Sequence, residues 1–332
     1  MALISISIFI AAAIISVFAA IKLSKYADII SKETKMGGML AGMLLLAVAT
    51  SLPELTASIS AGVIGSPDIA IGNGVGSILF NIFVLFLFDI HFRQKRLFLG
   101  VSSNHIYTGV IALLLCVIIG FALLVRSGPD FLGVSLTSFV IVIIYITGLT
   151  IVSRKQHLEM EEQEPVQFSR KKSVTNLSLK TLAWRFLIFA FVIFISGSAL
   201  TVSGDMLAES TGISATAVGS FLIALATSLP DAVGVYVALK VANINLAVGT
   251  ILGSNLFNVA SISTADVFYR SGSIWEDAGP QNVVTAAAAF SLTASVMLIL
   301  NRKKSRTTIT YLMPSLTAVA IYIGYGVYIF IF

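Results

Sequence analysis

The chain has 332 residues, of which 57% are hydrophobic and 11% are charged. Soluble domains carry about 25% charged residues, so this composition excludes an ordinary soluble globule and predicts a polytopic membrane protein. The net charge of +5 does not indicate a nucleic-acid partner, because the Lys and Arg residues lie in the segments that separate long apolar runs.

Ten apolar runs are long enough to cross a hydrocarbon core of ~30 Å as helices, so we predict an all-α membrane protein with ten transmembrane helices. The first run has no basic residue before Lys22, unlike a cleavable signal peptide, and is expected to be a true span. In chain order the predicted spans are 2–21, 38–63, 69–89, 104–125, 131–152, 182–203, 213–239, 245–268, 281–300 and 308–331.

The basic residues predict the orientation of these spans. With ten spans, 19 of the 21 Lys and Arg residues fall on one side of the membrane, and Arg126 and Arg270 remain on the other. The positive-inside rule then places both termini outside a cytoplasmic membrane. The uneven distribution of Lys and Arg also supports the count of ten spans, because a wrong count would place these residues on both sides of the membrane.

One stretch of the second span, residues 47–54, reads A-V-A-T-S-L-P-E and recurs 177 residues later, at 224–231, as A-L-A-T-S-L-P-D. The match at this offset extends to Gly72, Ser77 and Asn81, which align with identical residues. Each half holds five spans, an odd number, so the second half is expected to be inverted in the membrane, as in many secondary transporters. The predicted units are a first repeat at 1–152, a cytoplasmic linker at 153–181 and a second repeat at 182–332.

The repeated stretch places Glu54 and Asp231 near mid-bilayer, where an ionised carboxylate costs at least ~2.5–3.5 kcal/mol. Each acid follows a proline, Pro53 or Pro230, which is expected to kink or break its helix and to free backbone carbonyls. No Lys, Arg or His lies at this depth, so the balancing charge must be a proton or a bound cation.

Hydroxyls and amides are predicted to lie beside the two acids. They are Thr50, Ser51, Ser77 and Asn81 in the first half and Thr227, Ser228, Ser254 and Asn258 in the second. All-oxygen coordination suits Ca²⁺, Na⁺ or Mg²⁺ and argues against zinc or copper. One Ca²⁺ or two Na⁺ would neutralise both acids, and a third Na⁺ would have to sit on neutral oxygens, a role that Asn81 and Asn258 could fill.

Four further acids, Asp28, Asp89, Asp205 and Asp266, lie near the ends of predicted spans. We expect interfacial solvation or a supporting role for them rather than cation binding. The glycines of G-x-x-x-G at 72–76 and of G-x-x-x-G at 249–253 are expected to allow close helix packing.

The two A-T-S-L-P stretches, each ending in an acid and followed by G-x-x-x-G-S-x-x-x-N, resemble the alpha repeats of the cation/Ca²⁺ antiporter superfamily. The resemblance is greatest to prokaryotic sodium/calcium exchangers and covers both halves apart from the linker. It implies alternating access, in which the first and sixth helices slide over the rest. It also implies that Ca²⁺ binds Glu54, Asp231 and the backbone at Thr50 and Thr227.

The same resemblance implies Na⁺ sites at four serines and an amide pair, namely Ser51, Ser77, Ser228, Ser254, Asn81 and Asn258. Asn258 departs from relatives that carry Asp there, which puts K⁺ dependence in doubt. Proton-coupled exchangers resemble the chain less, because they tend to have an acid at the position of Asn81.

We therefore predict a Na⁺/Ca²⁺ antiporter that functions as a monomer in the lipid bilayer, with Ca²⁺ and Na⁺ as transported ions and no cofactor. A Ca²⁺/H⁺ antiporter is the nearest alternative, and a cation channel is an alternative of another class. The sequence shows no nucleophile with a base and no set of metal ligands suited to catalysis, so an enzyme is not expected.

Overall fold

The computed structural model describes residues 2–33, 48–102, 104–126, 128–162, 178–240, 244–300 and 307–331. This part of the chain is almost entirely helical, and nine of its helices or helical runs are long and apolar enough to cross a membrane. The nine are α1 (Ala2–Glu33), α4 (Pro67–His91), α5 (His105–Val125), α6 (Leu136–Glu162), α7 (Leu179–Thr211), the run Ala215–Lys240, α10 (Ile244–Phe268), α12 (Gln281–Leu300) and α13 (Thr308–Ile331).

The shorter elements connect or interrupt these helices. The run Ala215–Lys240 consists of α8 (Ala215–Ala217), a π-helical turn η3 (Val218–Ile223) and α9 (Ala224–Lys240). The others are α3 (Leu52–Ile64), η1 (Arg93–Lys95), η2 (Leu97–Gly100), β1 (Asp130–Phe131), β2 (Val134–Ser135) and α11 (Ile274–Asp277).

Three predicted span boundaries were wrong, and one of them is the end of the sixth span, where α7 continues beyond residue 203 to Thr211. The first helix continues to Glu33 instead of ending at residue 21, because no Gly or Pro interrupts the helix-compatible residues that follow Lys22. The fifth span begins at Leu136, because residues 130–135 form an antiparallel hairpin whose turn has Gly133 at a φ of 77°. In the described residues the regular structure is therefore helical except for this small sheet.

The two proline-containing stretches have different backbones. The chain bends at Ser51, and α3 begins at Leu52 with Pro53 in its first turn, so the predicted break is confirmed in the first copy. Residues 38–47 of the predicted second span lie outside the described residues. In the second copy Pro230 lies inside α9 and the helix continues to Lys240, so of the predicted kink or break the break does not occur there.

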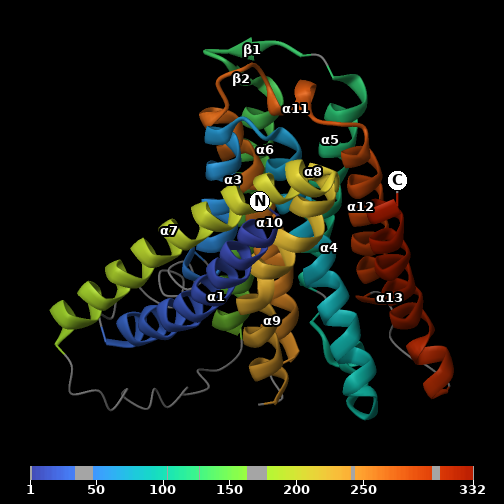
Figure 1. Ribbon diagram of the computed structural model, residues 1–332. Coiled ribbons are helices and arrows are strands. Elements are labelled where there is room, and N and C mark those ends of the chain that lie inside the picture. Colours follow the sequence, from blue (N-terminus) through green and yellow to red (C-terminus); the bar gives the residue numbers. More distant parts are fainter. Residues whose placement is uncertain are drawn as a thin grey trace.

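Helices α1 and α7 lie side by side and lean away from the rest of the bundle (Figure 1). Their contact has its own hydrophobic cluster, separate from the main core. Its buried members are Ala19, Ala20, Leu23, Ala27, Ala49 and Ile193. The main core is centred on α4 and α10, which contact most of the other long helices.

Helix α4 crosses η3 at very short distance. A Cβ atom on Gly72 would lie 3.0 Å from the backbone nitrogen of Ser220, and one on Gly76 would clash with the carbonyl of the same residue. Close packing by this glycine pair is therefore confirmed. In the second copy a Cβ atom on Gly253 would meet no described atom within 4 Å, so the expectation of close packing was wrong at that position.

Two buried acids connect the halves of the chain. Asp89 in α4 accepts a hydrogen bond from Ser315 in α13 at 2.6 Å, and Asp266 in α10 accepts one from Ser138 in α6 at 2.7 Å. Both residues of the second contact are offset by 177 positions from residues of the first. Of the two expected roles, interfacial solvation was wrong for these two acids, because both are fully buried, and their several hydrogen bonds agree with the other expectation, a supporting role.

A second pair of contacts has the same offset. Asp68 accepts a hydrogen bond from the backbone N–H of Gly279 at 2.6 Å, and Asn245 accepts one from the backbone N–H of Ser102 at 2.8 Å. Each contact joins one half of the sequence to the other. The halves are thus interlocked rather than packed as independent domains.

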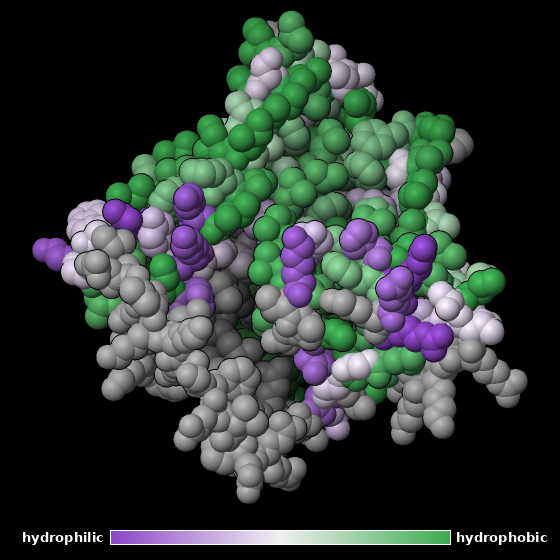
Figure 2. Space-filling model, turned by 90° about the horizontal axis from the view of Figure 1, so that it is seen from below, coloured by the Kyte–Doolittle hydropathy of each residue, from purple (hydrophilic) through white to green (hydrophobic). Residues whose placement is uncertain are grey.

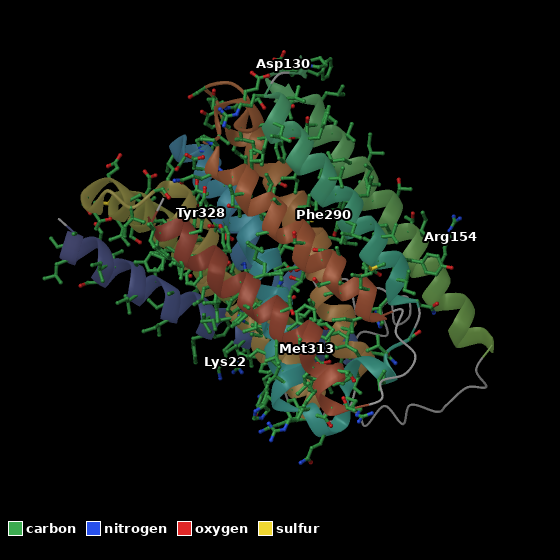
Figure 3. All side chains as sticks on the ribbon, turned by 90° about the vertical axis from the view of Figure 1, so that its right-hand side faces the viewer. Lys22, Asp130, Arg154, Phe290, Met313 and Tyr328 are labelled. Carbon is green, nitrogen blue, oxygen red and sulfur yellow. The ribbon has the colours of Figure 1, made fainter. Side chains whose placement is uncertain are left out.

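Polar side chains gather at one end of the molecule. Figure 2, seen from below, shows hydrophilic side chains around this end and hydrophobic ones beyond it. Helices α4 and α9 extend to this end in Figure 1, and both Arg93, which begins η1 just after α4, and Lys240, the last residue of α9, are exposed. In Figure 3 Asp130 lies at the opposite end, while Lys22 lies toward the polar end.

Candidate functional site

The two acids of the repeated stretch meet inside the bundle. Glu54, in the first turn of α3, is fully buried, and Asp231 in α9 is 1% exposed. Their carboxylates lie close enough to interact electrostatically. Ser228 donates a hydrogen bond to Oε1 of Glu54 at 2.9 Å, and Ser254 donates one to Oδ2 of Asp231. Two acidic side chains from the two copies are thus held near each other inside the bundle.

Amide groups complete one side of this pair. Asn81 in α4 donates from Nδ2 to Oδ2 of Asp231 at 3.4 Å and to Oδ1 of Asn255 at 3.1 Å. The Thr50 side chain, just before the bend at Ser51, also hydrogen-bonds Asp231. Each of these groups is neutral, so the hydrogen bonds orient the carboxylates without balancing their charge.

Several oxygens of the site have no hydrogen-bond partner in the described part of the chain. They are Oε2 of Glu54, Oδ1 of Asp231, Oδ1 of Asn81, Oδ1 of Asn258 and Oγ of Ser77. A buried polar atom without a partner costs ~1–3 kcal/mol, and more when it is charged. The free oxygens of the two carboxylates, together with Oδ1 of Asn81, whose amide contacts Asp231, are acceptors that a desolvated cation would satisfy.

Within the described part of the chain, no buried Lys or Arg side chain balances the acids. Among the described residues no Lys or Arg is buried, and no group of three or more His, Cys, Asp and Glu side chains is placed to hold a metal. The available donors are carboxylate, amide and hydroxyl oxygens, which suit hard cations. The arrangement can therefore hold Ca²⁺ or Na⁺ more readily than a transition metal.

Hydrogen bonds connect most of the ten predicted site residues. The hydroxyls of Ser51 and Ser254 are 3.4 Å apart, which joins the bend in the first copy to Asp231. Thr227 instead donates to Asn73 at 3.3 Å and to the carbonyl of Ala224, so its hydroxyl does not contact either acid. Ser77 and Asn258 are buried, but no side-chain hydrogen bond among the described residues joins them to the others.

Two asparagines of the site were missed by the sequence analysis. Asn73 donates to the backbone carbonyl of Glu54 at 3.1 Å, and Asn255 accepts from Asn81. Both lie within the glycine-containing stretches, but their counterparts at the 177-residue offset are Thr250 and Ile78. We selected candidate residues that are identical at this offset, and this criterion excludes Asn73 and Asn255. A search for any amide at the depth of the acids would have found both.

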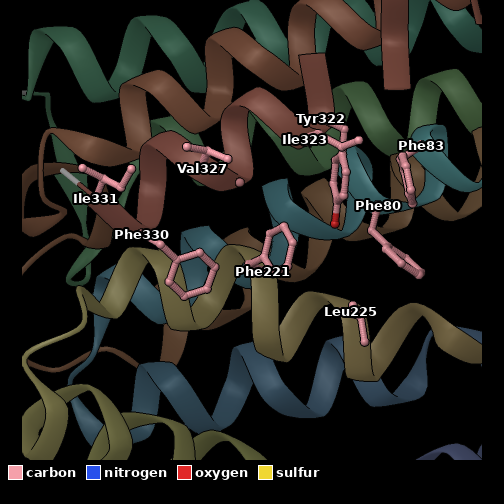
Figure 4. A pocket seen from close by; sticks show the side chains of 10 residues that line it. Phe80, Phe83, Phe221, Leu225, Tyr322, Ile323, Val327, Phe330 and Ile331 are labelled. Atoms are coloured by element: carbon pink, nitrogen blue, oxygen red, sulfur yellow. The ribbon is translucent and has the colours of Figure 1, made fainter. Parts of the chain in front are cut away.

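A large cavity lies apart from these residues. It has a volume of about 630 Å³ and is lined by aromatic and aliphatic side chains of α4, η3, α9 and α13, including Phe80, Phe221 and Tyr322 (Figure 4). None of the ten predicted site residues lines it. Its apolar walls do not suit an inorganic cation.

Comparison with known proteins agrees with this chemistry. The family model described as "Sodium/calcium exchanger protein" matches residues 4–154 and 181–332. The putative antiporter CaxA of Alkalimonas amylolytica is 24% identical over 274 residues, covering 80% of this chain and 81% of that protein.

Two solved structures share the fold. The H⁺/Ca²⁺ exchanger CAX superposes with a TM-score of 0.66 at 14% identity, covering 98% of this chain and 88% of that one. The sodium-calcium exchanger NCX_Mj superposes with a TM-score of 0.56 at 20% identity, covering 97% of this chain and 98% of that one. Proteins of this fold thus include one named for exchange with H⁺ and one named for exchange with Na⁺.

Proposed function

The chain belongs to the sodium/calcium exchanger protein family, and from this premise we propose that it is an antiporter that exchanges Na⁺ for Ca²⁺ by alternating access. The transported ions bind between Glu54 and Asp231. The observation that carries the proposal is the pair of buried, unpartnered carboxylate oxygens, Oε2 of Glu54 and Oδ1 of Asp231. One Ca²⁺ or two Na⁺ would neutralise this pair, so the two ions compete for the same charges.

The proposed cation ligands are the ten residues identified from the sequence. Glu54 and Asp231 supply the charge, and the backbone at Thr50 and Thr227 supplies carbonyls. A backbone role at Thr227 agrees with a hydroxyl that is already engaged by Asn73. The neutral side-chain ligands are Ser51, Ser77, Ser228, Ser254, Asn81 and Asn258.

The proposed architecture is ten spans in two inverted repeats, 1–152 and 182–332, joined by the linker 153–181. The hydrogen bonds of Asp89 and Asp266, which share the 177-residue offset, support this repeat relationship. The polar end of Figure 2 would then face the cytoplasm, with both termini outside the cytoplasmic membrane. A single copy contains both carboxylates, so the proposed functional unit is a monomer.

Alternating access requires one group of helices to move relative to another. Helices α1 and α7 contact each other through their own hydrophobic cluster and lean away from the main core. Their proposed movement over α3 and α9 would expose the acids first to one side and then to the other.

A Ca²⁺/H⁺ antiporter is the second candidate, because two buried carboxylates can release Ca²⁺ by taking up protons. The shared fold with the H⁺/Ca²⁺ exchanger CAX supports this candidate. Sodium is favoured because the position of Asn81 holds an amide, which cannot exchange a proton in the physiological pH range.

The test uses purified protein in liposomes loaded with Na⁺ and diluted into K⁺ medium that contains Ca²⁺, with and without a protonophore. The proposal predicts Ca²⁺ uptake that needs the Na⁺ gradient and persists with the protonophore. Uptake that needs a pH gradient instead would assign proton coupling. Downhill Ca²⁺ flux without any counter-ion would indicate a channel.

A further inference from the structure

Asn255 is the amide that holds Asn81 in place. Its Oδ1 accepts a hydrogen bond from Nδ2 of Asn81 at 3.1 Å, while the second acceptor of that nitrogen, Oδ2 of Asp231, is 3.4 Å away. Asn255 is 1% exposed and Asn81 is fully buried, so water does not compete for either contact. The bond to Asn255 is the shorter of the two contacts that orient Nδ2 of Asn81.

The orientation of Asn81 decides which of its ends is available to a cation. A side-chain amide has its donors on nitrogen and its acceptor on oxygen, at opposite ends of a planar group. Because Nδ2 of Asn81 is engaged by two acceptors, its Oδ1 points elsewhere and has no partner among the described residues. Rotation of the amide by 180° would offer a cation N–H groups instead of oxygen.

Asn255 also makes the two halves of the site unequal. Its counterpart at the 177-residue offset is Ile78, which has no polar atom in its side chain. The second amide of the site, Asn258, therefore has no equivalent support from α4, and both of its side-chain polar atoms are unpartnered within the described part of the chain. The amide of Asn81 is therefore oriented by hydrogen bonds, whereas the amide of Asn258 has none among the described residues.

We propose that Asn255 is a positioning residue that turns the oxygen of Asn81 toward a Na⁺ ion. This inference rests on the proposed function. Ca²⁺ is held chiefly by the carboxylates of Glu54 and Asp231, whose charge does not depend on Asn255. A Na⁺ ion beyond the two that these carboxylates neutralise depends on neutral oxygens, and Asn81 is one of them. Asn255 thus contributes to Na⁺ binding more than to Ca²⁺ binding.

The variant Asn255→Leu tests this, since leucine has a similar size and no acceptor, and Asn255→Ala is measured beside it in case the larger side chain impairs folding. In proteoliposomes we expect the Na⁺ concentration for half-maximal exchange to rise about tenfold, the effect of losing one hydrogen bond. The half-saturating Ca²⁺ concentration should change by less than about threefold. The control is Ser263→Ala, which removes a different buried polar group of α10, the Ser263 hydroxyl. It should change neither the Na⁺ nor the Ca²⁺ concentration for half-maximal exchange.

A double-mutant cycle separates positioning from a general structural effect. If Asn255 acts through Asn81, then Asn255→Leu should have no further effect on Na⁺ dependence when Asn81→Leu is already present. Additive effects would overturn the proposal, as would equal losses of Na⁺ and Ca²⁺ affinity in the single variants.

Thermal stabilisation of the purified protein by added Na⁺ provides a readout that needs no transport. The wild type should be stabilised by Na⁺, and Asn255→Leu should need a higher Na⁺ concentration for the same shift. If the wild type is stabilised and the variant responds identically, this inference fails while the proposed function stands. If Na⁺ does not stabilise the wild type and does not drive its Ca²⁺ uptake, the proposed function itself fails.

Discussion

Ser228 in α9 donates a hydrogen bond to Oε1 of Glu54 in α3 at 2.9 Å, and this bond joins the two copies of the repeated stretch. The counterpart of Ser228 in the first copy, Ser51, does not make the mirror-image contact with Asp231. Its hydroxyl lies 3.4 Å from that of Ser254, which in turn donates to Asp231. The two carboxylates therefore have different supports, although their sequences are nearly the same.

This difference predicts unequal effects of two matching substitutions. Ser228→Ala removes a hydrogen bond to a buried carboxylate, worth ~1.5–3 kcal/mol, so Ca²⁺ affinity should fall more than tenfold as Glu54 loses its orientation. Ser51→Ala removes a long contact between two hydroxyls and should have a smaller effect. The Ca²⁺ concentration for half-maximal uptake measures both. A larger effect of Ser51→Ala would contradict the geometry of the site.

The buried acids that connect the halves should be needed for stability. Asp89→Asn and Asp266→Asn each replace an oxygen acceptor by a donor that faces other donors, which costs ~1–3 kcal/mol, so both variants should melt at a lower temperature than the wild type. Asp130→Asn, at an exposed position in the hairpin, is the control. Melting in detergent, followed by size-exclusion chromatography, makes the comparison. Wild-type stability of both buried variants would argue against their role.

The glycines of the two copies should tolerate alanine differently. Gly76→Ala would place a methyl group against the backbone of Ser220, and overpacking of this kind costs ~1–3 kcal/mol. Gly253→Ala meets no described atom within 4 Å and removes backbone freedom, so it should be neutral or stabilising by ~0.5–1 kcal/mol. The melting temperatures of the two variants should therefore shift apart. Equal destabilisation by both would mean that α4 and η3 do not pack as described.

The lengths of the apolar runs predicted most of the long helices, because each membrane span must satisfy its own backbone within an apolar run. The hairpin at 130–135 was missed, since its apolar residues also read as the start of a span, and Gly133 alone marks the turn. Pro53 and Pro230 follow identical residues, yet only the first lies at a helix start. The surrounding helices, which the local sequence does not specify, decide that difference.

Within the site, repetition found the acids and their hydroxyls but not Asn73 and Asn255. Neither amide has an identical residue at the 177-residue offset, where Asn73 corresponds to Thr250 and Asn255 to Ile78, so a comparison of the two halves does not select them. Burial of Asp89 and Asp266 was not predicted from the sequence either, because their side-chain donors come from the opposite half of the chain. Contacts that cross between the halves are where the structure adds most to the sequence.

The central claim is that one Ca²⁺ ion binds between Glu54 and Asp231 and that Na⁺ competes for the same two acids. Equilibrium binding of radioactive Ca²⁺ to the purified protein tests this claim most directly. The account predicts that the wild type binds Ca²⁺, that Na⁺ displaces it, and that neither Glu54→Gln nor Asp231→Asn binds it at the same concentration. Both variants keep the size of the side chain and remove one of the two charges. Undiminished, Na⁺-sensitive Ca²⁺ binding by either variant would contradict the assignment of the site.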